Sequence, residues 1–240
     1  MNYRRILLKM SGESLGGSSG TGLDSRALDA RVDDIVEAHE MGIEVGIVPG
    51  GGNIFRGIHA DNSGLDRLVG DQMGMLATVM NALALQSKLS DRGIDARIWS
   101  SIPVGSFVHP FNSRTVREHL RKKQIGIFPG GTGNPFFTTD TAAALRALEI
   151  NADVLLKGTR VDGVYTADPE KERDAKFYRS ISFDKVLELK LAVMDLTAIT
   201  LCRENNLPVI VFNQNRTGSM KRVLLGEAEG TRILSSEKTT

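Results

Sequence analysis

Short apolar runs alternate with longer segments of helical periodicity along nearly the whole chain. The first two runs, Arg4–Met10 and Glu44–Val48, enclose a segment from Asp24 to Gly42 in which apolar residues recur at helical spacing. Strands that alternate with helices form parallel sheets whose two faces are covered by helices. The pattern therefore predicts an α/β fold, a three-layer sandwich with a mostly parallel central sheet.

Further elements follow the same alternation. Five more apolar runs are predicted as strands: Ala96–Trp99, Ile125–Phe128, Asp153–Lys157, Pro208–Phe212 and Arg232–Leu234. The further helical patterns are Leu65–Leu89, Ser113–Lys123, Thr138 or Thr139 to Ile150, Asp184–Leu191, Asp195–Asn206 and Ser219–Leu225. Three methionines of the long pattern, Met73, Met75 and Met80, are expected in the core. No linker divides the 240 residues, so a single domain spanning residues 1–240 is predicted.

Glycine is concentrated directly after predicted strands. It makes up 25 of 240 residues, about a tenth, against a usual share of about 7%. The clusters lie in Ser11–Gly22, Pro49–Asn53 and Pro129–Asn134. Ligands of open parallel sheets bind beyond the carboxyl ends of the strands, so glycine there indicates backbone that approaches a ligand closely.

Cations accompany these strand ends. Lys9 ends the first predicted strand and Lys157 the fifth, and two lysines from different strands can converge on one anionic group. Gly50–Asn53, followed by Arg56, is expected to offer backbone N–H groups to an anion at a helix start. The turn-rich loop Val161–Pro169 is a candidate for holding a base or a ribose.

Overall charge and cysteine content exclude several classes of protein. Lys and Arg number 30 and Asp and Glu 29, so the net charge of +1 argues against a nucleic-acid polymer as partner but not against a small anionic substrate. Cys202 is the only cysteine, so neither an intramolecular disulfide nor a cysteine metal cluster is possible. No signal peptide or membrane-spanning run of about 18 apolar residues is expected, which predicts a cytoplasmic protein.

Three common motifs of catalysis and nucleotide binding are disfavoured. Gly12–Gly16 matches the Gly-x-Ser-x-Gly elbow of serine hydrolases, but no helical pattern follows it directly. The chain has no Gly-Lys pair, which the Walker phosphate loop requires. Phe55 and Phe136 stand where the dinucleotide fingerprint has its third glycine.

The combination of motifs resembles the bacterial uridylate kinases of the amino-acid kinase family. The resemblance covers nearly the whole chain, and its most specific stretches are Gly50–Gly57, Val69–Thr78, Thr132–Asp140, Asp162–Pro169 and Val193–Leu196. It implies the amino-acid-kinase fold and direct in-line transfer of a phosphoryl group from ATP to UMP. Mg²⁺ bound with ATP is the implied cofactor, no metal ligand is assigned to protein side chains, and no phosphoenzyme forms.

The resemblance also implies roles for individual residues. Lys9, Lys157 and Asp140 are the implied catalytic residues, with Asp140 orienting the lysines or the metal. The implied ATP-binding residues are Lys9, Met10, Ser11, Gly12, Gly52, Arg56, Thr159, Tyr165 and Asp168. The implied UMP-binding residues are Gly51, Asp71, Thr132, Gly133, Asn134, Pro135, Phe136, Phe137, Thr138 and Thr139, with Asp71 on the ribose hydroxyls. UMP would thus bind mainly to the N-terminal part of the domain and ATP mainly to the C-terminal part.

Regulation and assembly rest on the resemblance alone. A loop linked to GTP activation corresponds to Gly17, Ser18, Ser19, Gly20, Thr21 and Gly22, although Thr21 stands where an aromatic residue is common. UTP inhibition and a homohexamer are further expectations, and Pro103–Lys123 departs from the family pattern. Two alternatives stay open: an enzyme of the same fold that makes an acylphosphate, and a non-catalytic protein that stores or senses an oxyanion or nucleotide.

Overall fold

The computed structural model describes residues 3–55 and 64–235. Within these residues the core of the fold is a nine-stranded sheet in the order β4-β3-β5-β2-β1-β6-β10-β11-β9. β10 and β11 run antiparallel, and the other pairs of this sheet are parallel. The mostly parallel sheet predicted from the alternation is therefore confirmed.

The strands of this sheet are β1 (Arg5–Met10), β2 (Glu44–Pro49), β3 (Ala96–Ser100), β4 (His109–Pro110), β5 (Ile125–Ile127), β6 (Val154–Thr159), β9 (Ser180–Ser182), β10 (Val209–Asn213) and β11 (Thr231–Leu234). A separate antiparallel pair is formed by β7 (Val164–Tyr165) and β8 (Phe177–Tyr178). β1 pairs with β2 on one side and with β6 on the other. The chain leaves β1 in one direction and returns on its other side at β6, which is the topological switch point where such sheets bind ligands.

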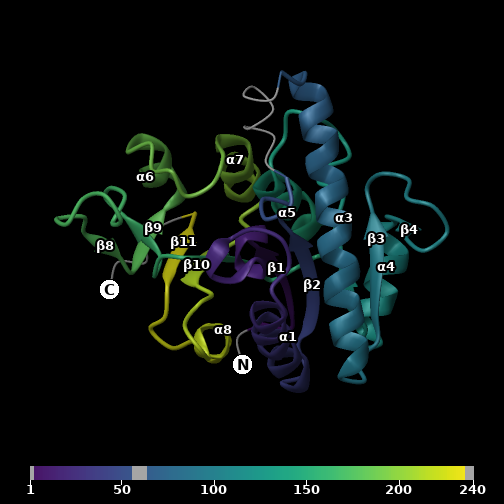
Figure 1. Cartoon of the computed structure of the whole chain (residues 1–240). Coiled ribbons are helices and arrows are strands. Elements are labelled where there is room, and N and C mark those ends of the chain that lie inside the picture. The colour runs from purple at the N-terminus through teal and green to yellow at the C-terminus, as the bar shows by residue number, and fades with distance from the viewer. Residues whose placement is uncertain (1–2, 56–63, 236–240) are drawn as a thin grey trace.

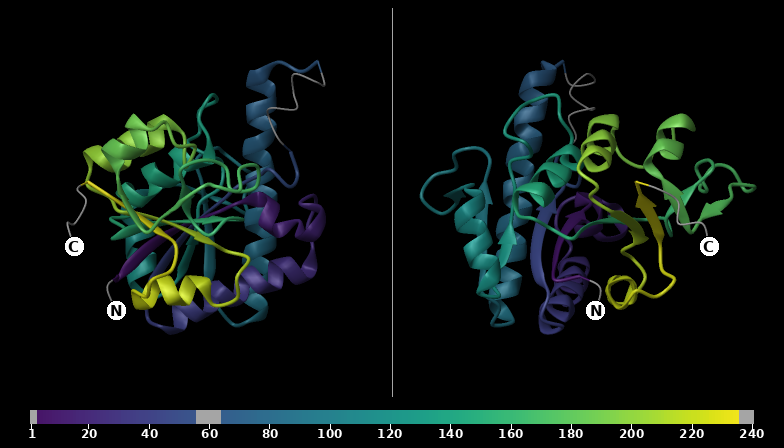
Figure 2. Two further views of the ribbon diagram at one scale, coloured as in Figure 1. Left: turned by 90° about the vertical axis from the view of Figure 1, so that its left-hand side faces the viewer. Right: turned by 180° about the vertical axis from the view of Figure 1, so that it is seen from behind.

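Helices cover both faces of the sheet (Figures 1 and 2). One face packs against α1 (Ser25–Glu40), α3 (Arg67–Asp91) and α8 (Ser219–Leu225). The opposite face packs against α4 (Ser113–Arg121), α5 (Thr139–Glu149), α6 (Phe183–Glu188) and α7 (Leu196–Glu204). The expected three layers are present.

Side-chain caps explain where several helices begin. The carboxylate of Asp24 accepts from the N–H of Ala27 at the start of α1, and Asp195 does the same with Ala198 at the start of α7. Of the two threonines considered for α5, Thr138 is the cap. Each cap satisfies a backbone donor that the helix itself leaves unbonded.

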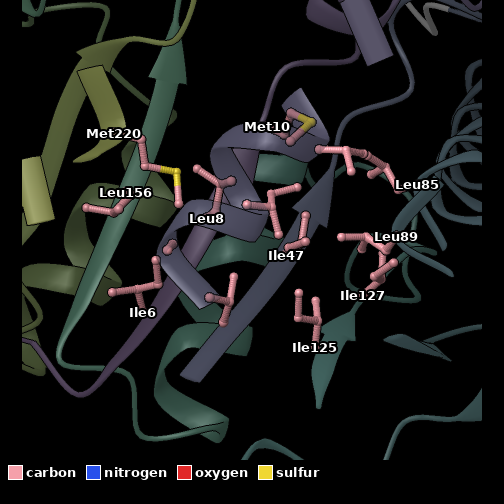
Figure 3. Close-up of a cluster of buried hydrophobic side chains, with 14 of the residues drawn as sticks. Ile6, Leu8, Met10, Ile47, Leu85, Leu89, Ile125, Ile127, Leu156 and Met220 are labelled. Atoms are coloured by element: carbon pink, nitrogen blue, oxygen red, sulfur yellow. The ribbon is translucent and has the colours of Figure 1, made fainter. Parts of the chain in front are cut away.

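Strand alternation separates two apolar cores. On the face that carries α1, Ile6, Leu8 and Met10 of β1 pack with side chains of β2, β5, β6, α3 and α8 (Figure 3). Leu7, which lies between Ile6 and Leu8, points to the opposite face and packs with α5. The same alternation sends Lys9 toward the α5 face, with consequences for the site described below.

The long helix α3 carries an exposed apolar stripe, formed by Leu68, Val69, Met73, Leu76 and Met80. The core position expected for Met73 and Met80 is therefore wrong, whereas Met75 is buried. By length and hydropathy α3 is the one described helix that could cross a membrane, with 44% of its most apolar window buried. The core helix of a soluble protein passes the same test, and α3 packs along α1 and β3.

The shortest elements were not predicted. Gly12–Leu15 and Gly17–Ser19 form two 3-10 helices, η1 and η2, and β4, β7, β8 and β9 contain two or three residues each. Elements this short carry no measurable periodicity.

Candidate active site

Two lysines face the same space at the switch point of the sheet. Lys9 and Lys157 are direct partners in the parallel pairing of β1 and β6. Side chains at paired positions of a sheet project from the same face. The convergence of the two strand-end lysines is therefore a result of strand register.

Asp140 holds both ammonium groups. It lies in the first turn of α5, and its Oδ1 is 2.9 Å from Lys9 Nζ while its Oδ2 accepts from Lys157 Nζ at 2.5 Å. Burial by itself raises the pKa of Asp140, but the charges of the two lysines prevail and lower this pKa to about 2. Asp140 is therefore a permanent anion that positions two cations.

Lys157 has a second partner from a distant part of the chain. Its Nζ also donates to the carbonyl oxygen of Val193 at 2.6 Å. Burial lowers the pKa of Lys157, against the effect of Asp140. Two ammonium groups that share one carboxylate leave positive charge available, which favours an anionic group between the lysines.

Asp195 is a site residue whose role sequence reasoning missed. Its carboxylate accepts from Thr138 Oγ1 at 2.5 Å, from Thr141 Oγ1 at 2.8 Å and from the N–H of Ala198 at 2.9 Å. It therefore ties the start of α5, which carries Asp140, to the start of α7. The sequence predicted a helix that begins at Asp195, but not the contact of Asp195 with residues of α5, which lie 50 or more positions earlier in the chain.

Two glycine loops pack directly against each other beside the lysines. A Cβ atom on Gly12 would lie 2.7 Å from the backbone nitrogen of Gly52, and one on Gly50 would lie 2.8 Å from that of Gly12. Asn53 donates to Asn81 at 3.0 Å and Asn81 donates back at 2.7 Å. Close approach of the loops to each other is therefore one reason for these glycines.

The Gly50–Asn53 loop is a turn in which the N–H groups of Ile54 and Phe55 donate to the carbonyl of Gly51. The described residues up to Phe55 contain no helix start at this loop. Arg56, the cation predicted to follow the loop, lies outside the described residues.

A cavity of about 340 Å³ lies between this loop, α3 and the loop before α5. Of the residues predicted for UMP, Gly51, Asp71, Phe137 and Thr139 line it. Gly74, Met75 and Thr78 of α3 also line it. All three belong to the Val69–Thr78 stretch that carried the resemblance, but no site role was predicted for them. The hydroxyl of Thr78 accepts from the N–H of Gly130 at 2.8 Å.

The remaining predicted residues of the 132–139 loop take other positions. Phe136 has a φ of 71° and its N–H donates to Asp71 Oδ2 at 2.8 Å, so this loop fixes the Asp71 carboxylate. Thr138 caps α5. Thr132 lines a different cavity, and Gly133, Asn134 and Pro135 line none of the cavities described here.

A second cavity, of about 540 Å³, lies beyond the end of β6. Thr159, Tyr165 and Asp168, the three residues predicted for the adenosine end of ATP, all line it. The segment from Leu189 to Val193 lines its other side, and no contact of this segment with a ligand was predicted. The carbonyl of Val193 thereby connects this cavity to Lys157.

A third cavity, of about 660 Å³, borders the η1–η2 segment. Ser11 and Gly52 line it together with Gly17–Thr21, whereas Gly22 exchanges two hydrogen bonds of 2.7 Å with Asn53. The side chain of Met10 is buried in the core, and its carbonyl accepts from the N–H of Gly50. Any contact of Met10 with ATP would therefore have to involve its backbone.

Comparison with known proteins gives consistent matches. The family model described as "Amino acid kinase family" matches residues 4–213. A uridylate kinase of Aliivibrio fischeri is 50% identical over 235 residues, covering 98% of this chain and 97% of the relative. A uridylate kinase of Psychrobacter sp. is 52% identical over 232 residues and 96% of each chain.

Solved structures match at the level of the whole fold. The UMP kinase of Bacillus anthracis has a TM-score of 0.95 and 39% identity, over 98% of both chains. The UMP kinase of Ureaplasma parvum has a TM-score of 0.92 and 36% identity, over 98% of this chain and all of the other.

Proposed function

The chain belongs to the amino acid kinase family, and from this premise we propose that it is a uridylate kinase, a nucleoside monophosphate kinase that transfers the γ-phosphoryl group of ATP to UMP. Its relatives at about 50% identity over nearly the full chain bear that name. The observation that carries the proposal is the Lys9–Asp140–Lys157 cluster, which lies at the switch point between strands whose ends border the cavities described above.

UMP occupies the 340 Å³ cavity in this proposal, with Gly51, Asp71 and the 132–139 loop around it. The adenosine of ATP occupies the 540 Å³ cavity at Thr159, Tyr165 and Asp168. The phosphates of ATP lie between these cavities, near Lys9, Ser11, Gly12 and Gly52. Arg56 stays a predicted ATP-binding residue outside the described residues. UMP thus binds mainly to the N-terminal part of one domain and ATP mainly to the C-terminal part.

The reaction needs charge neutralisation and alignment more than proton transfer. A phosphate oxygen of UMP attacks the γ-phosphorus, a new P–O bond forms, and the bond to the β–γ bridging oxygen breaks to give UDP and ADP. The attacking oxygen is already ionised near neutral pH, since a phosphate monoester has a second pKa of about 6. Lys9 and Lys157 stabilise the charge on the transferring group, and no phosphoenzyme is required.

Mg²⁺ is proposed to arrive with ATP. The described residues contain no group of three or more His, Cys, Asp or Glu side chains that could hold a metal ion. The Asp140 carboxylate already contacts both lysines. The donor set therefore fits an ion held mainly by the nucleotide phosphates, where it supplies further charge neutralisation.

Regulation, assembly and location are also proposals. GTP activates through the Gly17–Gly22 loop, and UTP inhibits at the nucleotide sites. The protein is proposed to be a cytoplasmic homohexamer of pyrimidine biosynthesis. The exposed apolar stripe of α3 supports association with another chain, and the number of six subunits rests on the resemblance.

One assay tests the proposal against both alternatives. ADP release is coupled to a spectroscopic readout, with ATP, Mg²⁺ and one acceptor at a time: UMP, CMP, acetylglutamate or carbamate. Turnover with UMP is the expected result. Turnover with acetylglutamate or carbamate but not UMP would identify an acylphosphate-forming enzyme. Absence of turnover with every acceptor would favour a non-catalytic nucleotide or oxyanion binder.

A further inference from the structure

Arg160 borders two of the cavities described above. It directly follows Thr159, the last residue of β6, and among the described residues it alone lines both the 540 Å³ and the 660 Å³ cavity. In the proposed function the first cavity holds the adenosine of ATP. Ser11 and Gly52, assigned to the ATP phosphates, line the second. A nucleotide that extends from one cavity to the other therefore passes Arg160.

One carboxylate from each cavity contacts the Arg160 guanidinium. Glu170, which lines the 540 Å³ cavity, accepts from Nη2 at 2.9 Å. Glu13, which lines the 660 Å³ cavity, lies 3.6 Å from Nη1. The guanidinium thus lies between the loop that follows β1 and the loop that borders the adenosine, held by acidic groups that a more strongly bound anion can replace.

These two ion pairs are weak competitors for a phosphate. The side chain of Arg160 is 61% exposed, and the side chains of Glu170 and Glu13 are 53% and 26% exposed. Exposed ion pairs contribute little, because water solvates both partners and the pairing orders two long side chains. A guanidinium offers two parallel N–H donors that match two phosphate oxygens, and such contacts are stronger. Exchange of a carboxylate for a phosphate is therefore favourable.

Cations are scarce around the adenosine cavity. Its charged side chains, among the described residues, are Arg160, Asp168, Glu170, Glu172 and Lys190. Three carboxylates thus face two cations. Lys190 belongs to the segment on the other side of this cavity and does not line the 660 Å³ cavity. Arg160 is therefore the cation that lies between the adenosine and the phosphates.

The remaining cations of the site are engaged elsewhere. Lys9 and Lys157 are held by Asp140 and serve the transferring group in the proposed function. We propose that Arg160 binds the non-transferring phosphates of ATP and exchanges Glu13 and Glu170 for phosphate oxygens when the nucleotide binds. This role rests on the proposed function.

Calorimetry with the non-hydrolysable analogue β,γ-imido-ATP and Mg²⁺ tests the contact. Arg160→Met should bind the analogue roughly tenfold or more weakly than the wild type, because charge-assisted hydrogen bonds to phosphate are lost. Arg160→Lys keeps the charge but not the paired donors, so its affinity should fall between the two. Melting curves verify that both variants are folded. Equal affinity of Arg160→Met and the wild type would overturn the proposal.

Arg173→Met is the matched control. Arg173 is exposed on the loop that carries Glu170, and it lines neither cavity. Its replacement should leave the affinity for the analogue at the wild-type value. A loss as large as that of Arg160→Met would mean that any positive charge near this loop suffices, which would overturn a specific contact of Arg160.

Glu170→Gln separates a phosphate contact from a structural role. If Arg160 only held the loop through its ion pair with Glu170, removal of the carboxylate charge would weaken nucleotide binding as much as Arg160→Met does. If Arg160 binds phosphate, Glu170→Gln frees the guanidinium, and the analogue should bind as tightly as to the wild type or more tightly. A tenfold loss in Glu170→Gln would overturn the proposal.

Steady-state kinetics provide an independent arm. Arg160→Met should raise the KM for ATP by a larger factor than it lowers kcat, because the contact is made before and during the transfer. The KM for UMP should not change, since Arg160 does not line the 340 Å³ cavity. A fall in kcat at an unchanged KM for ATP would overturn the assignment to the non-transferring phosphates.

Failure of the proposed function would look different. A chain that phosphorylates another acceptor would fail the UMP assay, yet calorimetry with the analogue would still decide whether Arg160 contacts the phosphates of ATP. No binding of the analogue to the wild type would overturn both the proposed function and the role of Arg160.

Discussion

The two ends of β1 each carry a buried ion pair, and the pairs differ in how fully their donors are used. At the amino end, Arg5 donates from Nε to Glu44 at 2.7 Å and from Nη1 to the carbonyl of Ile150 at 2.5 Å, and its Nη2 also contacts Glu44. At the carboxyl end, two lysines share Asp140, and Lys9 has no other partner among the described residues.

Burial alone does not distinguish the two pairs. The side chains of Arg5 and Lys9 are 9% and 12% exposed. The donors of Arg5 are used within the fold, whereas the cluster at the carboxyl end keeps donor capacity for a ligand. We propose that this unused donor capacity separates the functional end of β1 from the structural one.

The largest expected effect is the loss of stability in Arg5→Met. Removing one partner of a buried pair leaves the charge of Glu44 uncompensated and costs about 3–5 kcal/mol. Urea unfolding measures the change, and kcat per folded molecule should stay at the wild-type value. A stability loss below 1 kcal/mol would show that the amino-end pair does not hold the fold.

Lys9→Met is the matched change at the carboxyl end. It removes one donor to the transferring group, so kcat should fall by a factor on the order of 10²–10³, equivalent to about 2.7–4 kcal/mol. Steady-state kinetics at saturating ATP and UMP measure it, with Arg5→Met as the control from the same strand. A kcat within threefold of wild type would show that Lys9 does not stabilise the transferring group.

A smaller effect on the free energy of unfolding is expected when acid titrates the Asp140 cluster. The pKa of Asp140 is lowered from 3.8 to about 2 by the two lysines, against its burial. Its contribution of about 2 kcal/mol to stability is therefore present above pH 4 and lost as the pH falls through 2. The difference in unfolding free energy between wild type and Asp140→Asn should shrink by this amount between pH 5 and pH 2. A difference that is constant over this interval would contradict the assignment.

The smallest effect is expected for Arg4→Met. Arg4 lies 3.3 Å from the same Glu44 carboxylate, but its side chain is 74% exposed. Exposed pairs contribute about 0–1 kcal/mol, so urea unfolding should detect little change. A loss as large as that of Arg5→Met would mean that burial is not what separates the two arginines.

The sequence predicted the layered fold because periodicity reports which face of each element is buried. Register then explains why Lys9 and Lys157 converge, since they are paired positions near the carboxyl ends of two neighbouring strands. The role of Asp140 came from resemblance, because a carboxylate in the first turn of a helix is also compatible with simple capping.

Other parts of the site depend on contacts that no local pattern encodes. The sequence predicted only that a helix begins at Asp195. The hydrogen bonds that Asp195 accepts from Thr138 and Thr141 exist because α7 packs on α5. Thr132 was grouped with Thr139 by motif, yet Gly131 and Gly133 have positive φ values and the loop turns Thr132 toward another cavity. Backbone direction in such loops follows from tertiary packing.

The pairing of Lys9 with Lys157 also has a consequence for the order of folding. The two residues are far apart in the chain but adjacent in the sheet, so their strands pair only after the intervening segments are in place. The charged cluster cannot assemble in a partly synthesised chain that lacks β6. Recovery of activity during refolding would therefore report the closure of the central sheet rather than the formation of its helices.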